Sequence, residues 1–365
     1  MRSLLVAIVV ASLVAGCADR WGQPAQSPAV LPPVPGAAPP PAGQDALTPL
    51  GYGSQVIAAG LVDPRALVFT PDGVPLVVEG SAASLIAVQA GGTLVPRAMG
   101  GGNGPWTGAA LIGHRIYVAE AGGPLGGRIL AVDGKGGVRP LPVALPGGGR
   151  VGPLAAGPDG WLYVGIAASP EDSSAAPCRP RGGGVRDRGD EGCSGTILRI
   201  SPDTGAVEAY AWGFHRPIGL AFTPAGRLMV ADAVAPGDNP VWQVAAGDWY
   251  GWPPAAGLLA AAGDGAGSGP NPPPPPAARV AGQVGALAVD HQPSAAFGPA
   301  GRAFIAVRPT GRPGEIAFVP PDGGPPQPFV TNLIRPAAIA FDPTGSSLWT
   351  VDGGTGRLWK ISKFQ

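Results

Sequence analysis

Three histidines are the residues of this chain best suited to proton transfer, because imidazole is the side chain whose ordinary pKa lies near neutral pH. They are His114, His215 and His291. We expect His114, which falls in a tight turn, to be exposed. His215 precedes Arg216 and Pro217 at the start of an apolar run. It could act as a base or make a structural hydrogen bond, and a functional role is also possible for His291.

Four carboxylates occupy one repeated position, the end of an apolar strand that follows a tight turn. One interpretation is a ring of oxygen ligands around a divalent cation that activates water. The other, which we favour, is that each carboxylate accepts backbone hydrogen bonds and fixes a loop of its own repeat. The four residues are Glu79, Glu120, Asp232 and Asp352.

A repeated unit of two short strands joined by a tight turn positions these side chains. Six copies are present, at 69–79, 111–120, 156–165, 222–232, 297–307 and 341–352. Three of the five spacings between successive turns are 41, 46 and 44 residues, and a four-stranded propeller blade takes about 40 to 45 residues. The sequence therefore predicts an all-β fold, a six-bladed β-propeller with four-stranded antiparallel blades.

Two segments lengthen the remaining spacings. The first, at about 169–194, is polar and contains two cysteines, and the second, at about 254–282, is rich in glycine and proline. We expect both to be surface insertions that form no strand. The last outer hairpin, 356–362, lacks a return strand. Residues 54–59 could supply it, which would close the ring by pairing the two ends of the chain.

The first 17 residues resemble a bacterial lipoprotein signal peptide. Arg2 precedes a short apolar run, 4–15, and the string VAGC that ends at Cys17 has the form of a lipobox. Cys17 would carry the lipid, and 18–48, rich in proline and alanine, would be a disordered tether to the propeller at 49–365. The sequence thus predicts an exported protein of the cell envelope, lipid-anchored to a membrane on its periplasmic side or at the cell surface.

The other two cysteines, Cys178 and Cys193, predict a disulfide, because an exported chain meets an oxidising compartment. The formal net charge is +0 and 13% of the residues are charged, with no basic stripe. Nucleic acid is therefore not expected as a partner. We expect a monomer.

The stretch 213–253 carries a resemblance to a known family. It contains GFHRPIGLAF, then TPAGRLMVAD, and ends in DWYGWP. It resembles the glucose/sorbosone dehydrogenase family, and weaker matches at 157–163, 195–199 and the end of the chain extend the resemblance to roughly 50–363. The resemblance implies an exported six-bladed propeller that uses pyrroloquinoline quinone (PQQ) with Ca2+ to oxidise aldoses or related aldehydes.

The resemblance also implies candidate site residues. His215 and Arg216 stand where the family usually has an Arg-Asn pair, so His215 is the candidate catalytic base and Arg216 a candidate cofactor contact. Arg150 and Arg308, beside strand ends, are further cofactor-binding candidates, because the three carboxylates of PQQ need cationic or metal partners. Asp238 is the acidic residue retained before the YGWP corner and the candidate metal ligand.

One departure from the family concerns catalysis directly. Family members carry a catalytic histidine a few residues before the GPDG turn, and this chain has none there, at about Gly149. We expect Trp249 and Tyr250 to pack their blade. Three functions stay open: a PQQ-dependent dehydrogenase-like protein acting on a small sugar or aldehyde, a non-catalytic binding propeller of the cell envelope, and a metal-dependent lactonase-type hydrolase. The last would need the strand-end carboxylates to face the channel.

Overall fold

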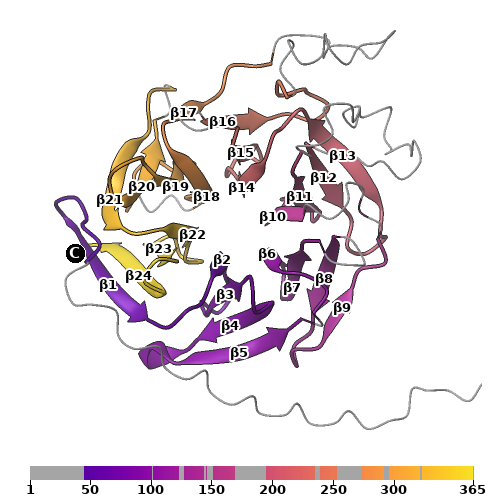
Figure 1. The fold of residues 1–365 in the computed structure, drawn as a ribbon, viewed down its shortest axis with the longest axis horizontal. Helices are drawn as coiled ribbons and strands as arrows, with labels where there is room; N and C mark the ends of the chain where they lie inside the picture. Colours follow the sequence, from indigo (N-terminus) through magenta and orange to yellow (C-terminus); the bar gives the residue numbers. More distant parts are fainter. Residues whose placement is uncertain are drawn as a thin grey trace, which may run out of the picture. The chain divides into compact units, whose positions relative to one another are not determined.

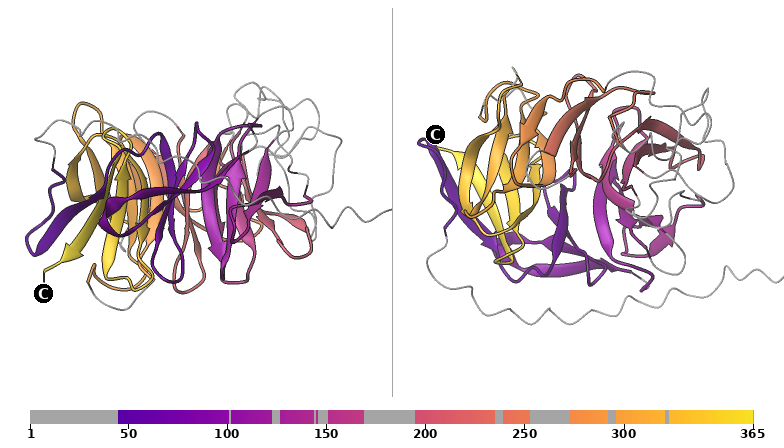
Figure 2. Two further views of the ribbon diagram at one scale, coloured as in Figure 1. Left: turned by 90° about the horizontal axis from the view of Figure 1, so that it is seen from below. Right: turned by 45° about the horizontal axis from the view of Figure 1, so that its top comes forward.

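Six four-stranded antiparallel sheets make up the protein (Figure 1). The structure, a computed structural model, describes residues 45–364 except 101, 123–126, 144, 146–150, 169–194, 235–238, 253–272, 292–295 and 321–322. Figure 1 shows the sheets as blades around a common centre, and Figure 2 shows them from two further directions. The predicted all-β, six-bladed propeller is confirmed. Among the described residues, no helix has the length and apolar character needed to cross a bilayer.

The blades follow one another along the chain, each with its first strand innermost. The strands of blades 1 to 3 are β2 (Pro64–Phe69), β3 (Pro75–Glu79), β4 (Ser84–Val88), β5 (Leu94–Met99); β6 (Trp106–Ile112), β7 (Arg115–Glu120), β8 (Arg128–Val132), β9 (Val138–Pro140); β10 (Val151–Ala156), β11 (Leu162–Ile166), β12 (Thr196–Ile200), β13 (Val207–Trp212). Those of blades 4 to 6 are β14 (Pro217–Phe222), β15 (Leu228–Asp232), β16 (Asn239–Val244), β17 (Ala278–Val280); β18 (Gln283–Val289), β19 (Ala303–Arg308), β20 (Gly314–Val319), β21 (Gln327–Leu333); β22 (Pro336–Phe341), β23 (Ser347–Asp352), β24 (Arg357–Lys363), β1 (Tyr52–Ala58). A short 3-10 helix, η1 (Ala90–Gly92), joins β4 to β5.

The tight turn between the first two strands has a local chemical cause. In blade 4, Gly226 has a φ of +74° and donates its N–H to the carbonyl of Thr223 at 2.8 Å. The Thr223 hydroxyl also accepts the N–H of Arg227 at 3.1 Å. Glycine adopts a positive φ without steric cost, and threonine side chains stabilise such turns. The Pro-x-Gly pattern in the sequence therefore marks the turn correctly.

Neighbouring first strands touch backbone to backbone. A Cβ atom added at Gly219 would lie 2.8 Å from the backbone nitrogen of Leu287 and 2.9 Å from the carbonyl oxygen of Gly285. One added at Gly108 would lie 2.8 Å from the nitrogen of Leu154. These contacts join the early parts of β14 and β18, and of β6 and β10. The first strands therefore begin at one end of the ring, which we call the entrance end.

The ring closes between the two ends of the chain. β1 pairs antiparallel with β24, with Tyr52 opposite Lys363 and Ser54 opposite Ile361. The predicted closure is confirmed, because β1 supplies the fourth strand of blade 6. Pairing of distant segments removes the open edge that a linear array of blades would leave.

One prediction about the insertions is wrong. The sequence predicts no strand in 254–282, but the end of this segment contains β17, which pairs with β16 through Asn239 opposite Val280. β17 is therefore the outer strand of blade 4. Its three residues, Ala278–Val280, follow a proline run and show no long apolar alternation, so the neighbouring strand rather than local propensity decides their conformation. The other insertion, 169–194, lies outside the described residues.

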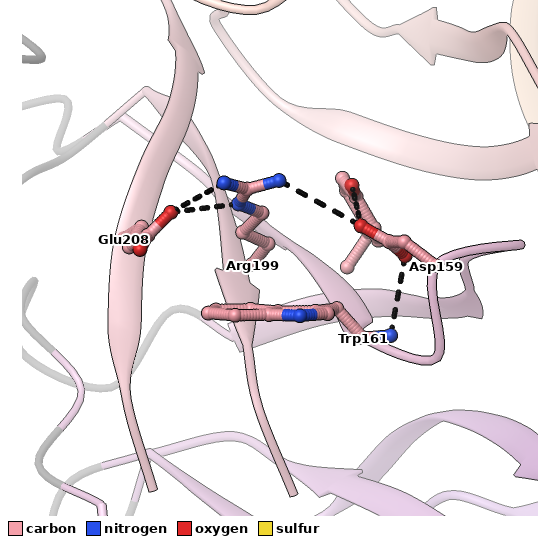
Figure 3. A network of polar contacts seen from close by, with 5 residues as sticks. Asp159, Trp161, Arg199 and Glu208 are labelled. Atoms are coloured by element: carbon pink, nitrogen blue, oxygen red, sulfur yellow. Dashed lines mark hydrogen bonds and ion pairs between the residues drawn. The ribbon is translucent and has the colours of Figure 1, made fainter. Parts of the chain in front are cut away.

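A polar network locks the outer part of blade 3 (Figure 3). The guanidinium of Arg199 lies over the ring of Trp161 at 4.8 Å and donates to Glu208 from Nε and from a terminal nitrogen, at 2.8 and 2.6 Å. It also forms an ion pair with Asp159 at 3.6 Å. Asp159 accepts the hydroxyl of Tyr163 at 2.9 Å. Since each charge has an opposite partner, this network is structural.

Candidate functional site

The centre of the ring holds a cavity of about 400 Å³, and the first strands of all six blades line it. Most lining residues are small or apolar, and four carry polar side chains: Arg65, Thr107, His291 and Asp342. The hydroxyl of Thr107 is already donated to the carbonyl of Val151 at 3.0 Å. The middle of the cavity therefore offers few side-chain groups for chemistry, and candidate groups have to come from its ends.

Three of the strand-end carboxylates hold the loops of the entrance end. Asp232 accepts the N–H of His215 at 3.0 Å and that of Arg216 at 2.6 Å. Asp352 accepts those of Ile334 and Arg335, at 3.0 and 2.7 Å. Each pair of donors immediately precedes the proline that opens the first strand of the same blade. In blade 1, Glu79 accepts the N–H of Val62 at 2.8 Å.

Glu120 follows this pattern only in part. It is buried, but its partners are side chains, the amide of Asn103 at 3.0 Å and the Nε of Arg128 at 2.8 Å. The favoured structural interpretation of the carboxylates is thus supported, with side-chain donors replacing backbone donors in blade 2. The alternative of a metal-holding ring is wrong for these four, because each accepts hydrogen bonds from donors of its own blade instead of converging with the others on one point. Within the described residues, no group of three or more His, Cys, Asp or Glu side chains could hold a metal ion.

Burial sets the acidity of Asp232. The carboxyl group is removed from water at the end of β15, and burial raises its pKa to about 6 although the N–H groups of His215 and Arg216 oppose the rise. A carboxylate in such a place depends on backbone dipoles for its stability, because no cation lies in an ion pair with it among the described residues. The loop that carries His215 is therefore coupled to a group that titrates close to neutral pH.

His215 is half-buried, and its ring is held in one orientation. Its Nδ1 lies 2.6 Å from the carbonyl oxygen of Ala233, so Nδ1 carries the proton and donates it. In the neutral ring, Nε2 is then the nitrogen with a free lone pair, as a general base requires. The ring also lies edge-on to Trp252, with 4.2 Å between centroids. The Ala168 N–H donates to the carbonyl of His215 at 2.7 Å and ties the loop to blade 3.

Two of the predicted cationic residues, Arg216 and Arg308, lie at the entrance end but not in the cavity wall. Arg216 is exposed directly before β14. Arg308 is exposed at the end of β19, where it donates to the side chain of Gln283 at the start of β18. Arg312, in the next loop, is paired with Glu315 at 3.2 Å. Among the described residues, Arg216 and Arg308 therefore form no ion pair with a carboxylate at the entrance end.

Two further arginines at this end were not predicted from the sequence as site residues. Arg65 and Arg335 flank the prolines that open β2 and β22, in neighbouring blades. A Cβ atom at Gly80 would lie 2.9 Å from Nε of Arg65, and one at Gly353 would lie 3.1 Å from Nε of Arg335. Aligning the repeats could have identified Arg335, because it directly precedes the first proline of its blade as Arg216 precedes Pro217. Arg65 lines the cavity and is paired with Asp63 at 2.9 Å.

The three histidines do not meet. His215 lies at the entrance end, whereas His114 occupies the exposed turn between β6 and β7, at the opposite end, as predicted for an exposed residue. His291 follows the end of β18 and lines the cavity at that opposite end. Burial lowers the pKa of His291, and Asp290 opposes this effect. Of the three histidines, only His215 therefore lies at the same end as these arginines.

The aromatic corner packs blade 4, as predicted for Tyr250. Its ring stacks on Phe214 with 4.8 Å between centroids, and its hydroxyl accepts the N–H of Ala245 at 2.8 Å. Trp249 lies 5.9 Å from Trp212 and donates from its indole to the carbonyl of Trp252 at 3.2 Å. This packing fixes the position of Trp252 beside His215.

Several predicted site residues lie outside the described part of the chain. They are Arg150, Asp238, Cys17, Cys178 and Cys193. Their assigned roles in cofactor binding, metal binding, lipidation and disulfide formation therefore stay predictions.

The entrance end fits one chemical requirement of the cofactor that the family resemblance implies. Among the described residues, Arg216, Arg308 and Arg335 are exposed and form no ion pair with a carboxylate. The carboxylates that end β3, β7, β15 and β23 at this end are buried, and each accepts a hydrogen bond within its own blade. In the described part of the chain, the exposed surface of this end therefore carries unpaired positive charge, as binding of a tricarboxylate requires.

Comparison with solved structures shows the same fold in sugar-oxidising enzymes and in other propellers. The PQQ-bound aldose sugar dehydrogenase of Streptomyces coelicolor is 22% identical, with 87% of this chain and 99% of that chain covered and a TM-score of 0.61. The soluble aldose sugar dehydrogenase of Escherichia coli, in its apo form, is 19% identical, with 86% and 100% covered and a TM-score of 0.61. A proposed gluconolactonase is 17% identical, with 87% and 94% covered and a TM-score of 0.55.

These likenesses establish the architecture, the six-bladed propeller shared by soluble PQQ-type sugar dehydrogenases and by lactonase-type proteins. No model of a protein family matches the sequence. No curated protein matches it either. The fold alone does not assign a function, which depends on the side chains at the entrance end.

Proposed function

We propose that the protein is an exported PQQ-dependent dehydrogenase of aldoses or related aldehydes, whose site lies at the entrance end of the propeller. The observation that carries the proposal is the arrangement around His215. Its Nδ1 is committed to the carbonyl of Ala233 at 2.6 Å, so its Nε2 can accept a proton. It stands directly before Arg216 on a loop that Asp232 holds at both residues.

The arginines of the entrance end have the charge that an acidic cofactor needs. Arg216, Arg308 and Arg335 would hold carboxylates of PQQ, and the guanidinium fork of each suits such a partner. PQQ, when bound, supplies the electron acceptor for a hydride from the sugar carbon. Asp238 remains the proposed contributor to a Ca2+ site.

His215 would take the proton of the substrate hydroxyl. A positioned base contributes on the order of 10² to 10⁴ in rate. In this role His215 would replace the family histidine that is absent near Gly149. Trp252, edge-on to the imidazole, limits the directions from which water reaches it. The proposal thus moves the base to a different wall of the site from the one that the family resemblance implies.

The decisive experiment is a titration of the full chain with PQQ in the presence and absence of Ca2+. The melting temperature of the protein is measured at each PQQ concentration. Saturable stabilisation is the expected result, because a ligand that binds only the folded state raises the stability with its concentration. Reduction of a dye by the loaded protein would then be screened with aldoses and small aldehydes.

Three variants locate the site. Arg335→Gln should weaken PQQ binding, and His215→Gln should retain binding but lose most of the dye reduction. Arg115→Gln is the control, because Arg115 is an exposed arginine at the opposite end, paired with Asp203 at 2.9 Å. No stabilisation by PQQ at any concentration would reject the proposal and favour a non-catalytic binding propeller.

A further inference from the structure

Exposed apolar side chains gather where the two ends of the propeller chain meet. The described residues contain seven large apolar side chains that are exposed, and three of them lie just before β1 or just after β24: Leu47, Leu50 and Phe364. Figure 1 shows this place at the margin of the ring, where the C-terminus lies beside β1. We call Leu50 and Phe364, with the turn between Pro49 and Tyr52, the terminal tip.

Leu50 is held at the apex of a turn. The N–H of Tyr52 donates to the carbonyl of Pro49 at 3.1 Å, and Gly51 has a φ of +89°. The apex side chain is fully exposed, with 103% of its reference area accessible. Such turns favour polar residues, glycine and proline. The leucine side chain at this position does not stabilise the fold by burial, because no part of the described chain covers it.

Phe364 is also fixed in place. Its N–H donates to the carbonyl of Gly51 at 2.8 Å. Its ring lies against Gly53, where a Cβ atom would approach the ring carbon Cε1 to 2.8 Å. Even so, 68% of the side chain is exposed. The glycine thus creates room for an aromatic ring that faces solvent beside Leu50.

The terminal tip lies at the opposite end of the propeller from His215. Asp352 pairs with both Pro336, which opens β22 at the entrance end, and Arg357, which opens β24. β24 therefore runs away from the entrance end and finishes at Lys363, opposite Tyr52. A surface that covered the tip would leave the arginines of the entrance end open to solvent.

The chain that precedes the tip indicates what covers it. Residues 1–44 join the described structure at Asp45, five residues before Leu50, and their sequence predicts a lipid on Cys17. The 27 residues between Cys17 and Asp45 span at most about 100 Å, so the propeller of an anchored molecule stays close to the bilayer and even a weak apolar contact becomes populated. Exposed Lys363, next to Phe364, adds a positive charge that suits anionic headgroups.

We propose that the terminal tip inserts Leu50 and Phe364 into the surface of the lipid bilayer and orients the propeller with its entrance end away from the membrane. The contact is a second, interfacial attachment in addition to the lipid on Cys17, and it rests on that lipid but not on the proposed enzymatic activity. Leucine and phenylalanine with an adjacent lysine are the residue types that partition into the boundary between headgroups and acyl chains.

The test uses the full, lipidated chain in vesicles of phosphatidylethanolamine and phosphatidylglycerol. A photoreactive benzoylphenylalanine replaces Phe364 in one protein and Met99 in another. Met99 is the matched control, because it is 50% exposed and pairs with Ser84 at the entrance end. After irradiation, mass spectrometry should find lipid adducts at position 364 and few at position 99. Adding Leu50→Asp should lower the yield at 364 about tenfold, since one leucine no longer leaves water.

Three results would overturn the proposal. Equal lipid labelling at 364 and 99 would show that the propeller has no fixed orientation. Crosslinks from 364 to a second copy of the chain, without lipid adducts, would assign the tip to a protein interface instead. Failure of the full chain to associate with the vesicles would remove the anchor on which the contact depends.

Discussion

The carboxylate of Asp232 accepts the backbone N–H of His215 at 3.0 Å, across the first two strands of blade 4. The same carboxylate accepts the N–H of Arg216 at 2.6 Å, and the residue after it, Ala233, accepts the imidazole N–H of His215 at 2.6 Å. The end of β15 therefore fixes both the backbone and the ring of the candidate base. Asp352 holds Ile334 and Arg335 in the equivalent way in blade 6.

Asp232 should make the stability of the protein depend on pH. The pKa of its carboxyl is about 6 in the folded protein and 3.8 as its ordinary value. Between these values the folded state binds more protons, so its stability falls as pH rises through the window and is constant above it. The wild type should therefore lose about 2 kcal/mol from this group between pH 4.5 and pH 7.

Chemical unfolding of the wild type and Asp232→Asn at both pH values measures this contribution. The variant lacks the titrating group, so its destabilisation relative to the wild type should be larger at pH 4.5 than at pH 7. A difference that is the same at both pH values would mean that Asp232 titrates normally.

The ring of His215 should be protonated on Nδ1 when neutral. With three histidines in the chain, 15N-labelled imidazole signals can be assigned from His114→Gln, His215→Gln and His291→Gln. Asp232→Asn should shift the signal of His215, because it frees the loop, whereas Asp352→Asn breaks the equivalent contact in blade 6 and should leave that signal in place. A neutral ring protonated on Nε2 would contradict the contact with Ala233.

Gly219→Ala should destabilise the ring by about 1 to 3 kcal/mol, the usual cost of overpacking. The added methyl group would lie 2.8 to 2.9 Å from Leu287 and Gly285, which belong to the neighbouring blade. Gly134→Ala is the matched control, because a Cβ atom there meets nothing within 4 Å. Thermal unfolding of the two variants should differ clearly, and equal melting temperatures would show that the inner strands can separate.

Arg199→Lys should destabilise blade 3 by about 1 kcal/mol, because lysine cannot make the paired hydrogen bonds to Glu208 while stacking on Trp161. The expected loss of stability is small because the Arg199 side chain is 33% exposed, and water screens its ion pairs. Arg115→Lys, in a pair whose side chains are 71% and 77% exposed, should change the free energy of unfolding by less than about 0.5 kcal/mol. Denaturant titration compares them, and a larger effect at Arg115 would argue against the network.

Local sequence determined most of the architecture. Six recurrences of a glycine turn between apolar runs predict the first two strands of each blade, because turn chemistry and alternation act over a few residues. The same reasoning found the closure of the ring by β1, since a hairpin without its return strand needs a partner. It also predicted that Asp232 and Asp352 would hold loops of their own blades.

Tertiary structure decided what depends on neighbours distant along the chain. β17 forms because β16 offers it an open edge, although its own residues show no strand pattern. The site was predicted only in part: His215 and Arg216 lie at the entrance end, whereas the sequence analysis overlooked Arg65 and Arg335. The positions of charged residues around a channel follow from how the first strands pack, and the orientation of the His215 ring depends on the carbonyl of Ala233, directly after β15. Such contacts leave no regular pattern in the sequence. The residues that make them come together only when the ring has folded.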